Sequence, residues 1–357
     1  MNKLIILFLL FIFVIPLSVQ SQIKVELNLA GDVYYATDNE KDVGLAPRTL
    51  SEICFTNPFK DRIGTNNVLL SAKTTDKLWR TNFAIAHFGD GSITPEEANI
   101  GLNLIQRLWL EGGYYACWDV DYTYDKWFTE TSLTELRIMA SPYLSLGVSY
   151  EFTNETSLRA GIMNNAFTPA FPVNTAYGSI YFGNLTKSIY AKFTTDNLYK
   201  DCGLTVSFLT GNVNDTKMSE IFLKLQGHCI DKLESQLMVK YFIWSPRDLN
   251  SKNLLSIQLQ GRYHFIEKFT TGLRFAYTYN EERFVIPGYS GLDIGVVCEY
   301  NPTPFTYLRL EGGMLSFFNT DGLSSRLFWD GNKIVDSRMS LALSMGFKFG
   351  LFHTEIK

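Results

Sequence analysis

The sequence predicts an all-β fold, a single closed antiparallel transmembrane β-barrel of about sixteen strands that occupies residues 22–357. Three observations lead to this prediction. Apolar and polar residues alternate along many segments, as they do in a strand whose two faces meet different surroundings. Many of these segments have about 9 to 12 residues, the length that a tilted strand needs to cross a bilayer. The connections between them also alternate between short and long, which is typical of outer-membrane barrels.

The N-terminal segment, residues 1–21, predicts a secretory signal peptide. Lys3 supplies a positive start, and the apolar run LIILFLLFIFVIPL follows it. Val19 and Ser21 are small residues at the −3 and −1 positions of a cleavage site before Gln22. An uncleaved membrane anchor is the alternative, but the apolar run is short for one. We therefore expect an exported chain that is cleaved between Ser21 and Gln22.

Composition and charge argue against several classes of function. The 357 residues carry a formal net charge of −4 and contain no run rich in Lys and Arg, so we expect no nucleic-acid partner. Beyond the N-terminal segment, no apolar run is long enough for a transmembrane helix, although apolar residues make up 46% and aromatic residues 15% of the chain. The five cysteines form no CxxC pair and have no His at zinc spacing, so no metal and no cofactor are expected.

The alternation predicts about sixteen strands. The clearest is 337–349, where Met339, Leu341 and Leu343 face away from Ser340 and Ala342. In order along the chain the expected strands are 23–36, 67–75, 79–87, 99–105, 108–118, 143–152, 156–164, 187–195, 202–211, 219–229, 234–244, 253–265, 268–280, 289–300, 305–317 and 337–349.

The connections predict the orientation of the barrel. Tight polar turns follow the even-numbered strands, around Asp76-Lys77, Gln106-Arg107, Asn154-Glu155, Asp231-Lys232, Glu267-Lys268 and NPTP at 301–304, with a looser turn near 196–201. Long connections follow odd-numbered strands and include 37–66, 88–98, 119–142, 165–186 and 318–336. Outer-membrane barrels have short periplasmic turns and long extracellular loops, so we expect the tight turns on the periplasmic side.

Two kinds of structure are expected in the long connections. Thr94, Pro95 and Glu97 form a capping box, which predicts a short helix. One long loop, 119–142 or 165–186, is expected to fold inward and narrow the barrel. An alternative role for the aromatic segment WFTETSLTELRIM in the first of these loops is a contact patch for a binding partner.

Charged residues in mid-strand mark the face that we expect to line a pore. By parity this face presents Lys192, Lys224, Lys240, Arg262, Arg274, Arg309, Glu299, Glu311 and Lys348, and also Lys73, Arg80, Arg159, Glu26, Asp32, Glu111, Glu151 and Asp293. So many ionised groups do not suit a dry core, because burying unpaired charge is costly. The alternative is a cross-strand ladder that fixes the shape of the barrel, as Arg309 and Glu311 beside Glu299 suggest. The slight basic excess predicts a weak preference for anions.

Aromatic residues near strand ends are expected to form girdles at the membrane interfaces. The candidates are Trp79, Trp109, Trp118, Tyr150, Phe152, Tyr241, Trp244, Tyr263, Phe265 and Phe349. No catalytic residue is predicted, because neither HExxH nor GxSxG occurs and no Ser or acidic partner can be assigned to His228 or His264 from spacing.

The N-terminal half resembles the β-barrel porin-2 (OmpL-like) family of bacterial outer-membrane proteins. The resemblance rests on GDVYYATD (31–38), LLSAKTTDKLWRTNFAIAHFGD (69–90), RLWLEGGYYACWD (107–119) and SPYLSLGVSYEFTNETSLRAGIMNN (141–165). It implies a porin-like barrel and transfers no catalytic residues. Such barrels usually end on an aromatic residue that the barrel-assembly machinery recognises, whereas here HTEIK follows Phe352, so an internal Phe is expected to serve.

We therefore expect a channel in the bacterial outer membrane, through which small hydrophilic solutes diffuse passively or with weak selectivity, and no enzymatic activity. Barrels of 16 to 18 strands leave an aqueous channel. A non-conducting barrel whose long outer loops bind or adhere to a partner is the alternative. The expected partners are outer-membrane lipid, the solutes and the barrel-assembly machinery, and the barrel can form a homo-oligomer.

Overall fold

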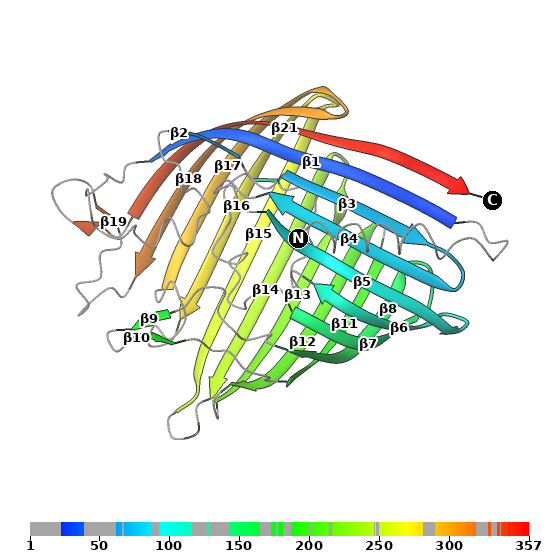
Figure 1. Ribbon diagram of the computed structural model, residues 1–357. Coiled ribbons are helices and arrows are strands. Elements are labelled where there is room, and N and C mark those ends of the chain that lie inside the picture. Colours follow the sequence, from blue (N-terminus) through cyan, green and yellow to red (C-terminus); the bar gives the residue numbers. More distant parts are fainter. Residues whose placement is uncertain are drawn as a thin grey trace.

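The computed structural model confirms the predicted closed antiparallel barrel (Figure 1). The structure describes residues 23–38, 62–65, 68–87, 93–115, 127–128, 143–164, 173–175, 178–180, 187–199, 201–213, 216–245, 247, 250–280, 290–318, 328–329, 334–335 and 337–356. The predicted signal peptide, residues 1–21, lies outside these described residues. No helix in the described ranges is long and apolar enough to cross a membrane.

Sixteen strand positions make up the wall of the barrel. The strands are β1 (Ile23–Asp38), β3 (Val68–Thr75), β4 (Trp79–His87), β5 (Ile93–Ile105), β6 (Leu108–Tyr115), β7 (Tyr143–Glu151), β8 (Thr156–Asn164), β11 (Lys187–Tyr199), β12 (Cys202–Val213), β13 (Thr216–Ile230), β14 (Leu233–Ser245), β15 (Lys252–Ile266), β16 (Phe269–Asn280), β17 (Ser290–Thr303), β18 (Thr306–Phe318) and β21 (Ser337–Ile356). Each pairs with the next, and β1 pairs with β21 to close the barrel.

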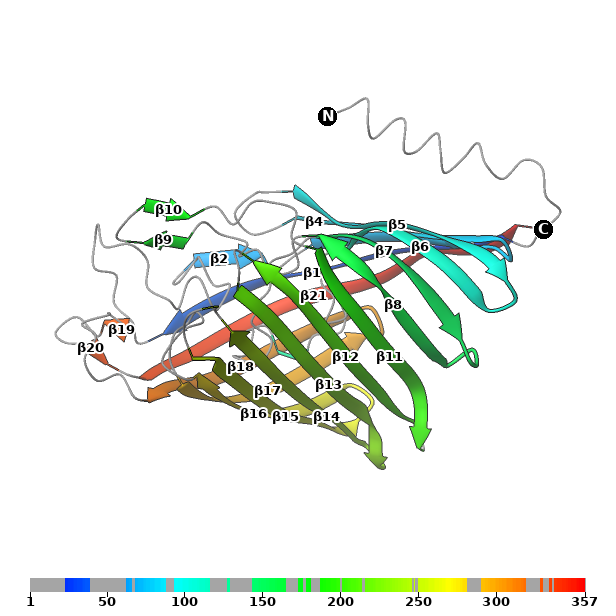
Figure 2. The same ribbon diagram turned by 90° about the horizontal axis from the view of Figure 1, so that it is seen from below.

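The second strand position is shared by two pieces of chain. β2 (Arg62–Thr65) pairs with residues 33–36 of β1, and β3 pairs with residues 24–30 of the same strand. Four further strands form two small pairs, β9 (Val173–Thr175) with β10 (Gly178–Ile180) and β19 (Phe328–Trp329) with β20 (Ile334–Val335). Both pairs lie at the end of the barrel opposite the tight turns (Figure 2).

The tight turns lie where the sequence predicts them. Arg107, Asp201 and Lys232 each adopt a positive φ, of 69°, 62° and 62°. Each follows a register shift in the adjoining strand pair, so a bulge and a left-handed residue together reverse the chain. The connection near 196–201, expected to be the loosest, contracts to two residues because β11 continues to Tyr199.

The two faces of the sheet differ as the alternation predicts. Large hydrophobic side chains stay exposed on the outward face, such as Leu146, Leu259 and Leu273 at 53%, 56% and 63%. Exposed aromatic pairs cluster beside the tight turns, where the ring centroids of Tyr150 and Phe152 lie 5.0 Å apart. Tyr263 and Phe265 form a second edge-to-face pair at 4.9 Å, and Phe305 and Phe349 form a stacked pair at 5.9 Å.

One of the predicted girdle residues differs from expectation, and a second is not tested. The prediction for Trp109 is wrong, because its ring is buried on the inner face with the Arg80 guanidinium 4.3 Å from the ring centroid. Its parity is that of Glu111, which already placed it on the inner face. Trp118 lies outside the described part of the chain.

The short helix predicted from Thr94, Pro95 and Glu97 is wrong. These residues open β5, with Thr94 opposite Ala86 and Pro95 opposite Ile85. The register shifts between Ala84 and Ile85, so one residue, Glu96, is added without a partner. A bulge accommodates a proline, which cannot donate to the ladder, and tertiary pairing therefore outweighs the local capping signal.

Candidate functional site

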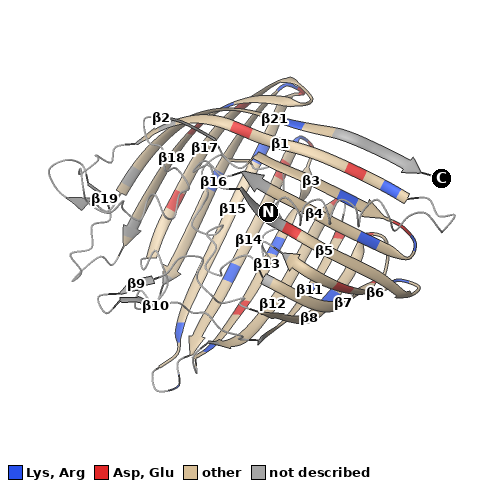
Figure 3. Cartoon of the chain, viewed as in Figure 1, with Lys and Arg blue, Asp and Glu red and all other residues tan. Residues whose placement is uncertain are grey.

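The inner face of the barrel holds the charged residues that the sequence assigns to a pore. Lys and Arg, and Asp and Glu, are spread over many of the strands among uncharged residues (Figure 3). On β16, for example, Arg274 is buried between Leu273 and Phe275, which are both exposed on the outward face. The nine predicted lining residues all occupy such inner positions, but they differ widely in their contact with solvent.

Three arginines, on β15, β16 and β18, form a ladder of ion pairs with acidic residues on β14 and β17. Arg274 Nη2 lies 3.1 Å from Asp293 Oδ1 across the β16–β17 pair. Arg309 donates to Glu299 Oε2 from Nε at 2.9 Å and from Nη2 at 2.6 Å. The predicted ladder between Arg309 and Glu299 is therefore present, and these four side chains are between 1% and 11% exposed.

Arg262 makes the third pair, with a partner that the sequence did not reveal. Its Nε and Nη2 donate to Glu234 Oε2 on β14 over 3.2 and 2.7 Å. The two side chains are 10% and 12% exposed. A carboxylate held by two donors of one guanidinium is fixed in orientation as well as neutralised.

A pair of aromatic residues from the connection between β6 and β7 packs on this ladder. The Arg262 guanidinium lies 4.9 Å from the centroid of Trp127, and that of Arg274 lies 4.6 Å from the centroid of Phe128. Both rings are 5% exposed and cluster with Val297 on β17. Part of the predicted inward loop 119–142 therefore lies inside the barrel, where two cation–π contacts hold it against the inner face.

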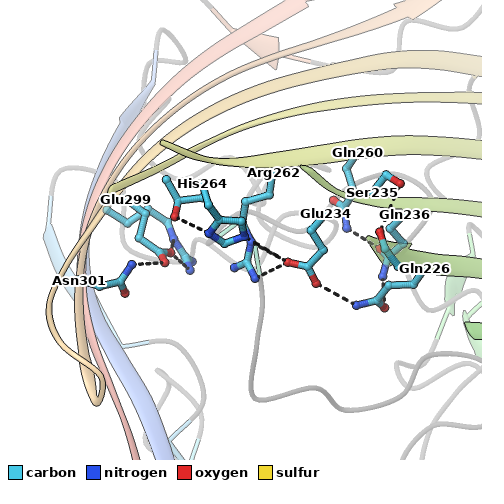
Figure 4. Close-up of polar contacts among 12 residues, drawn as sticks. Gln226, Glu234, Ser235, Gln236, Gln260, Arg262, His264, Glu299 and Asn301 are labelled. Carbon is cyan, nitrogen blue, oxygen red and sulfur yellow. Dashed lines mark hydrogen bonds and ion pairs between the residues drawn. The ribbon is translucent and has the colours of Figure 1, made fainter. Parts of the chain in front are cut away.

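Glutamine side chains continue the polar surface beyond the ladder (Figure 4). Gln236 Nε2 donates to Gln226 Oε1 over 2.8 Å, and Gln258 Nε2 donates to Gln260 Oε1 over 3.2 Å. Gln260 Nε2 also donates to Gln236 Oε1. Gln236, Gln258 and Gln260 are all buried. We call the inner face of β14–β18, with its ladder and glutamines, the covered wall.

A second cluster lies on β4 to β11. Arg80 donates to Glu111 and, over 2.6 Å, to Glu151, and Arg159 Nε lies 2.9 Å from Glu111 Oε2. One carboxylate therefore lies between two guanidinium groups. The Arg159 guanidinium lies 5.7 Å from the centroid of Tyr190, in the same way as Arg80 packs over Trp109.

This second cluster keeps its contact with solvent. The side chains of Arg80, Glu151 and Arg159 are 29%, 32% and 25% exposed, whereas Arg274 on the covered wall is 1% exposed. The residue types and the ion pairing are the same on both sides. We call the inner face of β3–β8 and β11 the open wall.

The predicted lining residues divide between the two settings. Lys192, Lys224 and Lys348 are half-buried. Lys240 is 1% exposed, with its Nζ 6.0 Å from the Phe222 centroid, and Glu311 is 2% exposed. The remaining four, Arg262, Arg274, Glu299 and Arg309, belong to the ladder and are buried as well.

A histidine near the tight-turn end has polar neighbours but does not form a catalytic triad. His264 Nδ1 lies 3.1 Å from Thr270 Oγ1, and its Nε2 lies 3.8 Å from Glu234 Oε2, beyond hydrogen-bond distance. The same Glu234 oxygen accepts both bonds from Arg262, and the Thr270 side chain is buried. Within the described residues, no group of three or more His, Cys, Asp or Glu could hold a metal ion.

Sequence reasoning missed the aromatic residues of the inner face. Tyr190 and Trp109 share the parity of Lys192 and Glu111, so alternation could have placed both of them. The inward position of Trp127 carries no such signal, because it lies in a long connection without periodicity.

Comparison with known proteins establishes the fold. No family model and no curated protein matches the chain, so membership of the OmpL-like family stays a prediction. Among solved structures, the outer-membrane channel DcaP of Acinetobacter baumannii matches with a TM-score of 0.61 at 10% identity, covering 92% of this chain and 97% of that one. An anion-selective porin from Comamonas acidovorans matches at 0.58 and 14%, with coverage of 92% and 100%. Pseudomonas putida OprB matches at 0.55 and 9%, with coverage of 92% and 94%.

Proposed function

We propose that the chain forms a porin-like channel in the bacterial outer membrane, through which small hydrophilic solutes diffuse passively. The observation that carries the proposal is the open wall. Arg80, Glu151 and Arg159 keep a quarter to a third of their side-chain surface exposed inside a closed barrel whose outward face is apolar. Ionised groups stay exposed where water reaches them, and water inside a barrel provides a route for solutes.

The passage that we propose runs beside the open wall and not through the centre of the barrel. Trp127 and Phe128 occupy space in front of Arg262 and Arg274 and so narrow the lumen from the covered wall. Lys192 on β11 joins Arg80 and Arg159 as a proposed lining residue of the open wall. Lys224 on β13 and Lys348 on β21, which belong to neither wall, are proposed to line the passage as well. The buried residues Lys240, Arg262, Arg274, Glu299, Arg309 and Glu311 are proposed to hold the wall in shape.

Several parts of this proposal are supported by likeness alone. The similar structures include an outer-membrane channel and an anion-selective porin, which supports the location in the outer membrane and the absence of enzymatic activity. One further neighbour, OmpT of Vibrio cholerae, is described in a trimer form at 11% identity and a TM-score of 0.54, which supports a homo-oligomer. Tight turns on the periplasmic side and cleavage of residues 1–21 complete the proposal.

Conductance across a planar lipid bilayer tests the channel function. Purified refolded protein should produce discrete current steps in potassium chloride, and a barrel opened by truncation of Trp127 and Phe128 serves as the matched comparison. If neither protein conducts, the non-conducting alternative holds. The alternative patch for a binding partner is less favoured, because Trp127 and Phe128, the first two residues of WFTETSLTELRIM, are buried inside the barrel.

The predicted export is tested separately by mass spectrometry of protein isolated from an outer-membrane fraction. The mature chain should begin at Gln22. A chain that retains residues 1–21 would show that the segment is an uncleaved anchor.

A further inference from the structure

Burial sorts the charges of the inner face by sign. The comparison covers the inner-face positions of the paired wall strands whose burial the structure describes. The buried acidic residues there are Asp32, Glu111, Glu220, Asp293, Glu299 and Glu311. The buried basic residues are Lys240, Arg262, Arg274 and Arg309. The positions that keep contact with solvent are basic at Lys24, Lys73, Arg80, Arg159, Lys192, Lys224, Lys252 and Lys348, and acidic at Glu26, Glu97, Glu151 and Glu234. Acidic residues predominate beneath the surface, and basic residues predominate on it.

On the open wall the sorting has a structural cause at Glu111. Its side chain is short, and two arginines, from β4 on one side and β8 on the other, reach over it and take positions nearer the lumen. Glu111 shows this clearly, since its side chain is 11% exposed while Arg80 and Arg159, which both contact it, are 29% and 25% exposed. The aromatic rings behind these guanidinium groups, Trp109 and Tyr190, support them in this position.

Three cations come together on the open wall as a result. Lys192 on β11 lies directly opposite Arg159 on β8 in the strand register. Arg80 approaches from the other side through the shared carboxylate of Glu111. Glu111 and Glu151 offset two of these three cations, so the cluster keeps one net positive charge. An ion in the passage responds most strongly to charges within about a Debye length, roughly 8 Å at physiological salt. Low-dielectric walls focus this field along the passage.

We propose that the passage selects small anions, such as chloride and small carboxylates, over cations, and that Arg80, Arg159 and Lys192 are its selectivity-determining residues. This inference rests on the proposed channel function and goes beyond it by naming the class of solute. It also goes beyond the charge of the chain as a whole, which is −4 and would by itself suggest the opposite preference.

Reversal potentials in a gradient of potassium chloride across a planar bilayer test the inference. The wild-type channel should show a higher permeability for chloride than for potassium. Arg159→Gln and Lys192→Gln should each lower the ratio of chloride to potassium permeability by roughly twofold, the factor expected when one unit charge about 8 Å away, screened by salt, acts with opposite sign on the two ions. Lys192→Gln serves alone if Arg159→Gln does not fold, because Lys192 is half-buried.

The matched control lies on the covered wall. The double variant Arg309→Gln/Glu299→Gln removes one cation and one anion that are buried against each other, and it should leave the permeability ratio unchanged. A wild-type channel that prefers potassium, or a ratio that Lys192→Gln leaves unchanged, would overturn the inference while the channel function stands. A shift in the control as large as that of Lys192→Gln would also overturn it. Absence of any conductance would instead refute the channel function and the inference with it.

Discussion

The buried ion pair between Arg274 and Asp293 allows a quantitative test of the covered wall. Arg274→Met removes a guanidinium that lies 3.1 Å from Asp293 and 4.6 Å from the centroid of Phe128. The two charged side chains are 1% and 4% exposed, so the remaining carboxylate cannot be rehydrated without opening the wall. Breaking a buried pair in this way costs about 3–5 kcal/mol, and loss of the cation–π contact adds about 0.5–2 kcal/mol.

The double variant Arg274→Met/Asp293→Leu separates the charge effect from packing. Replacing both members of a buried pair by apolar residues is often neutral, so this variant should recover most of the lost free energy. On the open wall, Glu151→Gln should cost at most about 1 kcal/mol, because exposed pairs contribute little and Glu151 is 32% exposed. The contrast between the two walls is the expected result.

Equilibrium unfolding in urea, with the protein in lipid vesicles and tryptophan fluorescence as the signal, measures these differences. Equal slopes against urea would show that the variants unfold from the same state. A loss below about 1 kcal/mol for Arg274→Met would refute the reasoning, since it would mean that water reaches this pair. A double variant as unstable as the single one would refute it too, because packing and not charge would then explain the loss.

Three further predictions follow from the described residues. Trp127→Ala with Phe128→Ala should raise the single-channel conductance, because the two rings hold a loop against the covered wall and each truncation costs about 3–5 kcal/mol of packing; unchanged conductance would contradict this. Gly113→Ala should destabilise the barrel by about 2 kcal/mol or more, because Gly113 has a φ of 143° and a Cβ would lie 2.4 Å from the Ala98 carbonyl oxygen. Gly312→Ala, whose nearest contact would be 3.9 Å, is its control in thermal unfolding, and equal losses would count against the strain. Lys232 has a φ of 62°, so Lys232→Gly should be neutral or stabilising by up to about 1 kcal/mol, and Lys232→Val should lower the melting temperature. A valine variant more stable than the glycine variant would show that residue 232 is not in the left-handed conformation.

Much of the fold could be predicted because alternation along a strand is a local property. Every one of the sixteen expected segments contains or overlaps a strand, and the parity that placed Arg274 and Glu299 on the inner face holds in the structure. The ends were less predictable. β5 begins at Ile93 because its first residues pair with β4, and β21 continues to Ile356 because its last residues pair with β1. The apolar and polar pattern of these residues does not predict either end.

The candidate site was predictable in composition and not in exposure. Parity identifies which charges face inward, but it cannot show that Arg262 and Arg274 are covered while Arg159 is not. That difference depends partly on Trp127 and Phe128, which come from a connection far away in the sequence. A contact of this kind depends on tertiary structure, and no periodic pattern in the sequence predicts it.

The pairing of β1 with β21 has a consequence for how the protein is made. These two strands are paired from Ile23 with Ile356 to Asp38 with Ser340, so the seam joins the two ends of the described chain. Closing a loop of this length costs on the order of 5 kcal/mol of chain entropy plus a constant, and local hairpins must supply the free energy for it. Until the seam forms, β1 and β21 present unpaired edges that can join another chain. Barrel closure therefore competes with aggregation during assembly. A catalyst that binds one unpaired edge until the last strand pairs would favour closure.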